Sequence, residues 1–136
     1  MAEQAYQELG ATEVIALIDA RMNEVYFSQL KREKVRSELG EFFQWNPVIE
    51  EQVCQPEKVL EQLSDLTAYR VGTGWAAYPQ FKDSGLEGSD VILPSAQYML
   101  ELALTDYAQN KVISALEIEP VYLRNEVTWK KLPGRE

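Results

Sequence analysis

Three acidic residues, Asp19, Glu24 and Asp90, are the first candidates for chemistry in this chain. Carboxylates that converge on divalent ions form the metal cluster of ribonuclease-H-like nucleases. Asp19 stands two residues before Arg21, where an ion pair or a turn hydrogen bond is the ordinary role of a carboxylate. The sequence does not place Glu24 or Asp90 beside it. We therefore predict a structural role for Asp19, no metal site and no catalytic residue.

The Gly72-Thr73-Gly74 segment is the second candidate, because glycine lets backbone amides approach a nucleotide closely. An isolated Gly-x-Gly sequence after a strand is more often a tight turn than a phosphate-binding loop. Gly72, Thr73 and Gly74 are thus weak candidates for nucleotide binding, and no cofactor is predicted.

The chain has no histidine and a single cysteine, Cys54. The commonest general base and the commonest zinc ligand are therefore both missing. A nucleophilic cysteine usually needs a base to form its thiolate, so we expect Cys54 to be a buried or half-buried apolar side chain. A serine–lysine pair or an aspartate dyad stays open as the basis of a peptidase, although no recognisable motif supports either.

Charge argues against independent binding of a nucleic acid. The sequence has 22 acidic and 13 basic residues, a net charge of -9, which opposes the counterion release that holds polyanions. The concentrated basic group near a chain end is Lys130, Lys131 and Arg135, in a tail at residues 130–136 that we expect to be mobile and solvated. These three charges could at most assist binding that is determined elsewhere.

Length and composition predict one compact domain, since 136 residues with 46% hydrophobic content can bury a core. No apolar run approaches the roughly 20 residues of a membrane-spanning helix, and no signal sequence is recognisable. A single cysteine suits a reducing compartment. We therefore expect a cytoplasmic protein without a membrane partner.

The first half of the chain contains the clearest element signals. A helix is predicted at residues 2–9, ending at Gly10, and residues 14–18 form an unbroken apolar run typical of a central strand covered on both faces. Residues 24–30 should return antiparallel to that run. Residues 40–47 are turn-prone, and residues 48–54 supply a third strand.

The second half alternates helix and strand. Pro56 should start a helix whose apolar face, Val59, Leu60 and Leu63, continues to Leu66. A short strand is expected at residues 68–71, an irregular helical turn at 75–81, a loop at 84–89 and an extended piece at 91–93. Ser95 should cap a helix ending near Asn110. Residues 120–129 are apolar and β-prone.

Apolar and aromatic side chains complete these expectations. The helix after Ser95 carries one stripe formed by Ala96, Met99, Leu100, Ala103 and Tyr107. Four aromatic residues could form either core or a docking surface, and we favour core for most of them: Trp45, Trp75, Tyr78 and Phe81. Together the elements predict an α/β layer fold, a mixed sheet covered by helices.

Several segments resemble the second lobe of the TsaB (YeaZ) family. They are Ile18-Asp19-Ala20-Arg21-Met22 with Glu24-Val25-Tyr26, Val71-Gly72-Thr73-Gly74-Trp75, Ile92-Leu93-Pro94-Ser95-Ala96, Glu119-Pro120-Val121-Tyr122-Leu123-Arg124-Asn125, and Trp129-Lys130-Lys131-Leu132-Pro133-Gly134. The family's amino-terminal lobe, with its glycine-rich stretch, is not recognisable. We therefore expect residues 1–136 to be one carboxy-terminal lobe of a two-lobe protein.

The resemblance implies a ribonuclease-H-like lobe of the actin-like ATPase superfamily. It also implies partners, the homologous catalytic subunit TsaD and the ATPase TsaE, which install threonylcarbamoyl on the tRNA adenosine beside the anticodon. Family members organise this reaction rather than catalyse it, can form homodimers, and have also carried glycoprotease-like and resuscitation-factor labels. We predict a scaffold or activator that does not bind tRNA alone. The alternatives are a degenerate nucleotide-binding module and a nuclease or peptidase.

Overall fold

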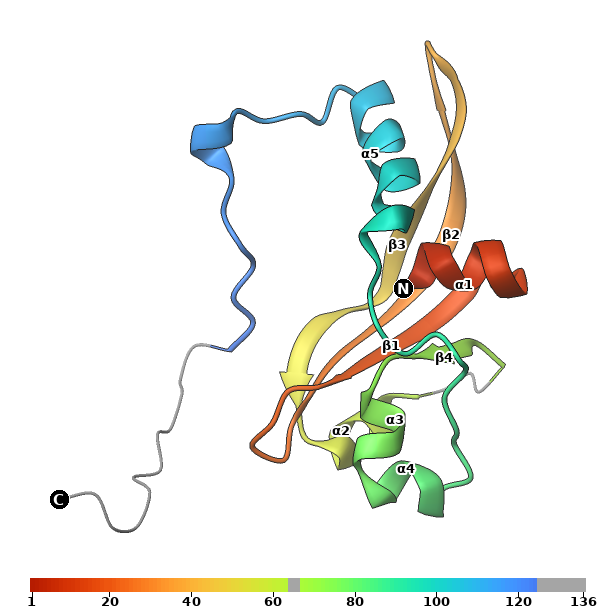
Figure 1. The fold of residues 1–136 in the computed structure, drawn as a ribbon, viewed down its shortest axis with the longest axis vertical. Coiled ribbons are helices and arrows are strands. Elements are labelled where there is room, and N and C mark those ends of the chain that lie inside the picture. The colour runs from red at the N-terminus through yellow and green to blue at the C-terminus, as the bar shows by residue number, and fades with distance from the viewer. Residues whose placement is uncertain (64–66, 125–136) are drawn as a thin grey trace, which may run out of the picture.

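The computed structural model describes residues 1–63 and 67–124 (Figure 1). Its helices are α1 (Ala2–Leu9), α2 (Pro56–Gln62), α3 (Gly74–Ala77), α4 (Pro79–Asp83) and α5 (Met99–Ala108), with short 3-10 turns at Ala96–Tyr98 and Ala115–Glu117. Its strands are β1 (Glu13–Asp19), β2 (Val25–Ser37), β3 (Gly40–Cys54) and β4 (Tyr69–Val71). None of the helices in the described ranges has the length and apolar character that crossing a bilayer requires.

The strands form one mixed sheet in the order β3-β2-β1-β4. β2 is antiparallel to both β1 and β3, whereas β4 runs parallel to β1 through the pairs from Val14 with Tyr69 to Ala16 with Val71. The predicted antiparallel pair, the short strand near residues 68–71 and the mixed α/β sheet are therefore confirmed.

Side chains of β1 are buried on both faces of the sheet, as the apolar run predicted. Ile15 and Leu17 join a core with residues of α2, α3 and α4, including Val59, Trp75 and Phe81. Val14 points to the opposite face, into a second cluster that contains Ala5 of α1. α1 itself ends as expected, because Gly10 has a left-handed φ of 72° and its N–H bonds the Tyr6 carbonyl.

The prediction of a turn at residues 40–47 was wrong. These residues are the first half of β3 and pair with β2 from Ser37–Gly40 to Leu30–Pro47, so the real turn is only Glu38 and Leu39. β-prone aromatic side chains outweigh the turn signals of Gly40 and Pro47 here. Pro47 is tolerated because β3 lies at the edge of the sheet, where a missing N–H costs little.

The carboxy-terminal expectations needed more correction. The predicted apolar stripe of α5 is exposed, and the buried contact is Thr105, whose hydroxyl donates to the Phe43 carbonyl at 2.7 Å. Residues 120–124 form no strand, whereas residues 91–93, predicted as an extended piece, have no regular secondary structure and accept a backbone hydrogen bond from Gly72 N–H at the Val91 carbonyl. Ser95 stands at the start of the first 3-10 turn without a side-chain cap bond.

Some predictions fall outside the described residues. Leu60 and Leu63 pack against the core, as expected, but the predicted helical face through Leu63 to Leu66 is wrong, because α2 ends at Gln62 and Leu63 is already extended; Leu66 itself lies outside the described residues. The same holds for the end of the β-prone segment at residues 125–129 and for the basic tail at 130–136, with Lys130, Lys131 and Arg135.

Candidate functional site

The candidate site lies where the parallel strands β1 and β4 both end. Ligands of open α/β sheets bind in the crevice outside the carboxyl ends of such strands. β1 ends at Asp19 and β4 at Val71, and the Gly72-Thr73-Gly74 segment follows β4 directly. The topology therefore brings two candidates of the sequence, Asp19 and the glycine segment, to one edge of the sheet.

Packing against β1 explains both glycines of the segment. Gly72 has a φ of 103°, and a Cβ built on it would lie 2.1 Å from the Leu17 carbonyl oxygen. A Cβ on Gly74 would lie 2.8 Å from Leu17 Cγ. Glycine is thus required here by close backbone approach within the fold. Binding of a nucleotide by these residues stays a prediction.

Thr73 and Tyr78 tie the glycine segment to the end of β1. The backbone N–H of Asp19 donates to Thr73 Oγ1 at 3.1 Å. The Tyr78 hydroxyl lies 2.9 Å from Asp19 Oδ1 and 2.9 Å from the Glu24 carbonyl, so it spans the start and the end of the β1–β2 turn. Asp19 Oδ1 also accepts the Arg21 N–H at 2.9 Å.

These contacts fix the protonation states of the site. The backbone N–H of Arg21, then the Tyr78 hydroxyl, hold the pKa of Asp19 below its ordinary value. Burial, then the hydrogen bond to Asp19, raise the pKa of Tyr78. At neutral pH Asp19 is therefore ionised and Tyr78 is protonated, and neither pKa is tuned toward the neutral value that general acid–base catalysis favours.

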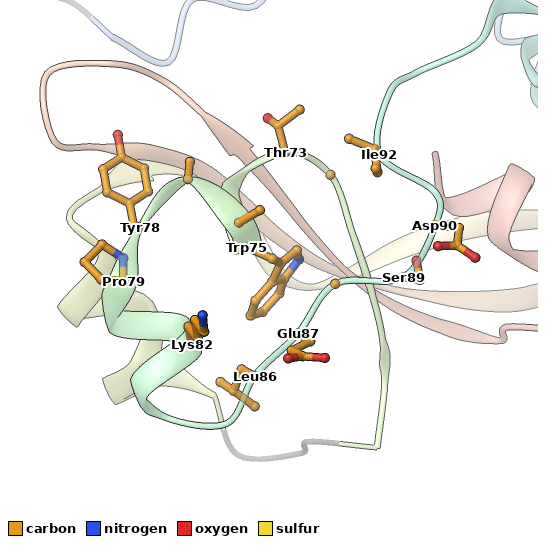
Figure 2. A pocket seen from close by; sticks show the side chains of 14 residues that line it. Thr73, Trp75, Tyr78, Pro79, Lys82, Leu86, Glu87, Ser89, Asp90 and Ile92 are labelled. Carbon is orange, nitrogen blue, oxygen red and sulfur yellow. The ribbon is translucent and has the colours of Figure 1, made fainter.

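A groove of about 870 Å³ opens beside this network, between α3–α4 and residues 86–92 (Figure 2). This volume is within the range of small-molecule sites. Its charged side chains are Lys82, Glu87 and Asp90, one cation against two carboxylates. This excess of negative charge does not favour the binding of a phosphate group. The rest of the lining is largely apolar, with Pro79, Leu86 and Ile92 among its side chains.

The aromatic residues mostly belong to the core, as predicted. Trp75 is 3% exposed, stacks edge-on against the buried Phe81 at a centroid distance of 5.2 Å, and donates its indole N–H to the Val71 carbonyl. Tyr78 is half-buried at the groove. Trp45 is half-buried on the other face of the sheet, where its indole N–H donates to Glu3 Oε2 at 3.0 Å.

The acidic candidates and the cysteine take structural positions. Asp19 pairs with Arg21 at 3.8 Å, as expected, and Glu24 pairs with Arg124. Asp90 stands apart on the groove rim, and the described residues contain no metal-binding group of three His, Cys, Asp or Glu side chains. Cys54 is half-buried, and burial followed by the charge of Glu24 raises the pKa of its thiol, which disfavours the reactive thiolate.

Sequence reasoning missed the unusual backbone of the β1–β2 turn. Arg21, Met22 and Asn23 have φ values of 62°, 55° and 60°, a left-handed conformation that residues other than glycine seldom adopt. It also missed Arg124, which donates to the Ala20 carbonyl of this turn at 2.8 Å. No glycine marks the turn, and its sequence signal is limited to Asn23, a residue type that tolerates the left-handed conformation.

Curated relatives match the chain along all of its length. It is 65% identical over 136 residues to the tRNA threonylcarbamoyladenosine biosynthesis protein TsaB of Haemophilus influenzae. It is 43% identical over 141 residues to the protein of the same name from Escherichia coli. In both cases the chain spans 58% of the relative's length. No protein-family model matches the chain.

Two solved structures share the fold. One is YeaZ from Pseudomonas aeruginosa, with a TM-score of 0.67 and 32% identity over 89% of this chain and 54% of that one. The other is a protein with similarity to peptidase YeaZ from Pseudomonas aeruginosa, with a TM-score of 0.66 and 32% identity over 90% of this chain and 54% of that one. The predicted resemblance to TsaB (YeaZ) is confirmed, and the mixed sheet with its helices agrees with the ribonuclease-H-like, actin-like class.

Proposed function

We propose that this chain, which matches TsaB proteins along its whole length, is a noncatalytic lobe that acts in tRNA threonylcarbamoyladenosine biosynthesis. The observation that carries the proposal is the 65% identity over all 136 residues to a protein of that name. Because the chain spans 58% of that relative, we propose that it acts as one part of a longer protein. Its place of action would be the cytoplasm, with TsaD and TsaE as partners.

The exposed apolar surface of the carboxy-terminal region supports the lobe proposal. Met99 and Leu100 of α5 are 63% and 65% exposed, and Leu116 of the following segment is 97% exposed. Met99 and Leu100 are neighbours on α5, and contiguous apolar side chains on a surface usually mark an interface. The remaining lobe of the longer protein is the occupant that we propose, and a second copy of the chain is the alternative.

The chemistry of the groove supports a noncatalytic role. Its charged groups are a lysine and two carboxylates, its tyrosine has a raised pKa, and the chain contains no histidine that could act as a general base. Asp19 and Tyr78 are committed to a hydrogen-bond network that joins two loops. The described residues thus offer contacts for organising a partner, and TsaD would supply the transfer chemistry.

Reconstitution tests this function. The 136-residue chain is mixed with TsaD, TsaE, tRNA and the activated threonylcarbamoyl donor, and modified adenosine is quantified by mass spectrometry. A protein of full TsaB length that contains the sequence serves as the control. We expect modification with the longer protein and none with the chain alone. Full activity of the chain alone would show that this half carries the activating contacts.

A degenerate nucleotide-binding module is the second candidate, because the groove of about 870 Å³ includes Gly72 and Thr73 in its lining. Thermal unfolding with ATP and magnesium, and separately with adenosine, distinguishes the two functions. The scaffold proposal expects no shift with either ligand. A saturable shift that is lost in a Thr73→Val variant would favour the nucleotide module. The nuclease and peptidase alternatives have no comparable observation in their favour among the described residues.

A further inference from the structure

The turn between β1 and β2 stores backbone strain at an exposed position. Arg21, Met22 and Asn23 are consecutive and all have positive φ values between 55° and 62°. Strained backbone of this kind persists only where surrounding contacts over-determine it. The turn closes with two backbone hydrogen bonds of 3.0 Å, from Ala20 N–H to the Glu24 carbonyl and from Glu24 N–H to the Arg21 carbonyl.

Two side chains from distant parts of the sequence clamp this turn from different sides. Tyr78, on the groove side, has its hydroxyl 2.9 Å from both Asp19 Oδ1 and the Glu24 carbonyl. Arg124 donates to the Ala20 carbonyl at 2.8 Å and forms an ion pair with the Glu24 carboxylate. Both clamps therefore contact Glu24, one through its backbone and one through its side chain.

Arg124 is the far end of the carboxy-terminal arm, which we define as residues 109–124. Figure 1 shows the arm leaving α5 and running beside the body of the protein. Apolar side chains along the arm are exposed: Val112, Ile113, Leu116, Ile118, Val121 and Tyr122. Arg124, in contrast, is only 14% exposed. The arm thus combines exposed apolar side chains with a half-buried polar end.

We propose that Arg124 is a latch that fastens the carboxy-terminal arm to the strained β1–β2 turn and thereby couples displacement of the arm to the groove at Tyr78 and Thr73. A partner that binds the arm and withdraws Arg124 removes one of the two clamps. The turn then relaxes, and Asp19, which bonds both Tyr78 and Thr73, transmits the change to the groove. By linkage, a ligand that stabilises the groove contacts also favours the latched arm. The proposal rests on these contacts and does not require the tRNA function.

Residue-resolved amide hydrogen exchange of the 136-residue chain tests the latch. The reporters are the N–H groups of Ala20 and Glu24 in the turn and of Asp19, which bonds Thr73 Oγ1. Arg124→Gln should accelerate exchange at all three by about tenfold, the effect of losing charge-assisted hydrogen bonds. The matched control is Arg36→Gln, because Arg36 is an exposed arginine that also pairs with a glutamate, Glu41. It should change none of the three.

If amide exchange at all three reporters is unchanged in Arg124→Gln, the latch proposal is wrong. If exchange accelerates at Ala20 and Glu24 but stays unchanged at Asp19, the turn is not coupled to the groove. A chain that ends after residue 108 supplies a second test, because it removes the arm while every residue of the turn stays the same. It should reproduce the Arg124→Gln result at all three reporters. A large effect of truncation with no effect of Arg124→Gln would show that another arm residue holds the turn.

Discussion

The two ends of this molecule use apolar side chains in opposite ways. Around β1 and β4, residues such as Leu17, Val71 and Phe81 are fully buried against neighbouring elements. Along α5 and the arm, comparable side chains such as Leu100 and Leu116 face outward. In the first region, which we call the complete region, the described residues themselves cover the apolar side chains. In the second region the apolar side chains are exposed, so they would add stability only in contact with another protein surface. The groove therefore lies against buried core elements, and the carboxy-terminal surface is the one that we propose a partner covers.

Removing a core side chain of the complete region should have the largest effect. Leu17→Ala deletes a fully buried side chain of the central strand, and we expect a loss of about 2–5 kcal/mol in the free energy of unfolding. Ile15→Ala should behave similarly. Denaturant unfolding measures both variants. Losses below about 0.5 kcal/mol, the range of surface substitutions, would mean that β1 is not buried as described.

Gly72→Ala should be the next most damaging change. Its Cβ would lie 2.1 Å from the Leu17 carbonyl oxygen, at a φ of 103°. We expect a cost of about 1–3 kcal/mol, from strain at a special backbone conformation. Gly10→Ala is the control, because Gly10 also has a positive φ of 72° but a Cβ there meets nothing within 4 Å. Equal losses in the two variants would contradict the close approach to Leu17.

Tyr78→Phe should show a smaller, pH-dependent loss. A typical lost hydrogen bond costs about 0.5–1.5 kcal/mol. Because the folded-state pKa of Asp19 is lowered, its stabilising contribution is present above the unfolded pKa and disappears as the pH falls through the folded pKa. Removing the hydroxyl should move the folded-state pKa of Asp19 up toward its ordinary value, so the pH window in which Asp19 loses its contribution narrows from below and the total loss on acidification becomes smaller. Carboxyl NMR titration follows this shift, and an unmoved Asp19 pKa would contradict the contact.

Polar substitution on α5 should have the smallest effect in the isolated chain. Leu100→Ser replaces a side chain that is 65% exposed, so the free energy of unfolding should change by less than about 0.5 kcal/mol. The same substitution in a protein of full TsaB length should cost more, because there we expect this surface to be covered. Unfolding of the two proteins, each with and without the substitution, measures the difference. A large loss in the isolated chain would mean that α5 is already packed there.

Local patterns predicted most of the complete region. The apolar run at Val14 to Ile18, the stop at Gly10 and the start at Pro56 each depend on neighbours in sequence, and the structure confirms all of them. The first half of β3 was missed because its partner strand, not its own turn-prone residues, decides its conformation. The sequence correctly identified an apolar stripe on α5. Periodicity alone, however, does not show whether another part of the chain packs against such a stripe, and here the stripe is exposed.

The site was only partly predictable. The pairing of Asp19 with Arg21 is local and was expected. The contacts of Asp19 with Thr73 and Tyr78 span 54 and 59 residues, and that of Arg124 with Ala20 spans 104. Such contacts arise from the topology, which brings the ends of β1 and β4 together, and no spacing rule in the sequence contains them. The positive φ values at Arg21 to Asn23 were also missed, and we propose that the distant contacts at Ala20 and Glu24 stabilise them.

Hydroxyl-radical labelling tests most directly the claim that the carboxy-terminal surface is completed by the rest of a longer protein. The reporters are Tyr107 on α5, 67% exposed, and Tyr69 on β4, 42% exposed. Labelling of the 136-residue chain is compared with labelling of a protein of full TsaB length that contains it. We predict that Tyr107 becomes protected in the longer protein while Tyr69 keeps its reactivity. Equal labelling of Tyr107 in both proteins would contradict the claim.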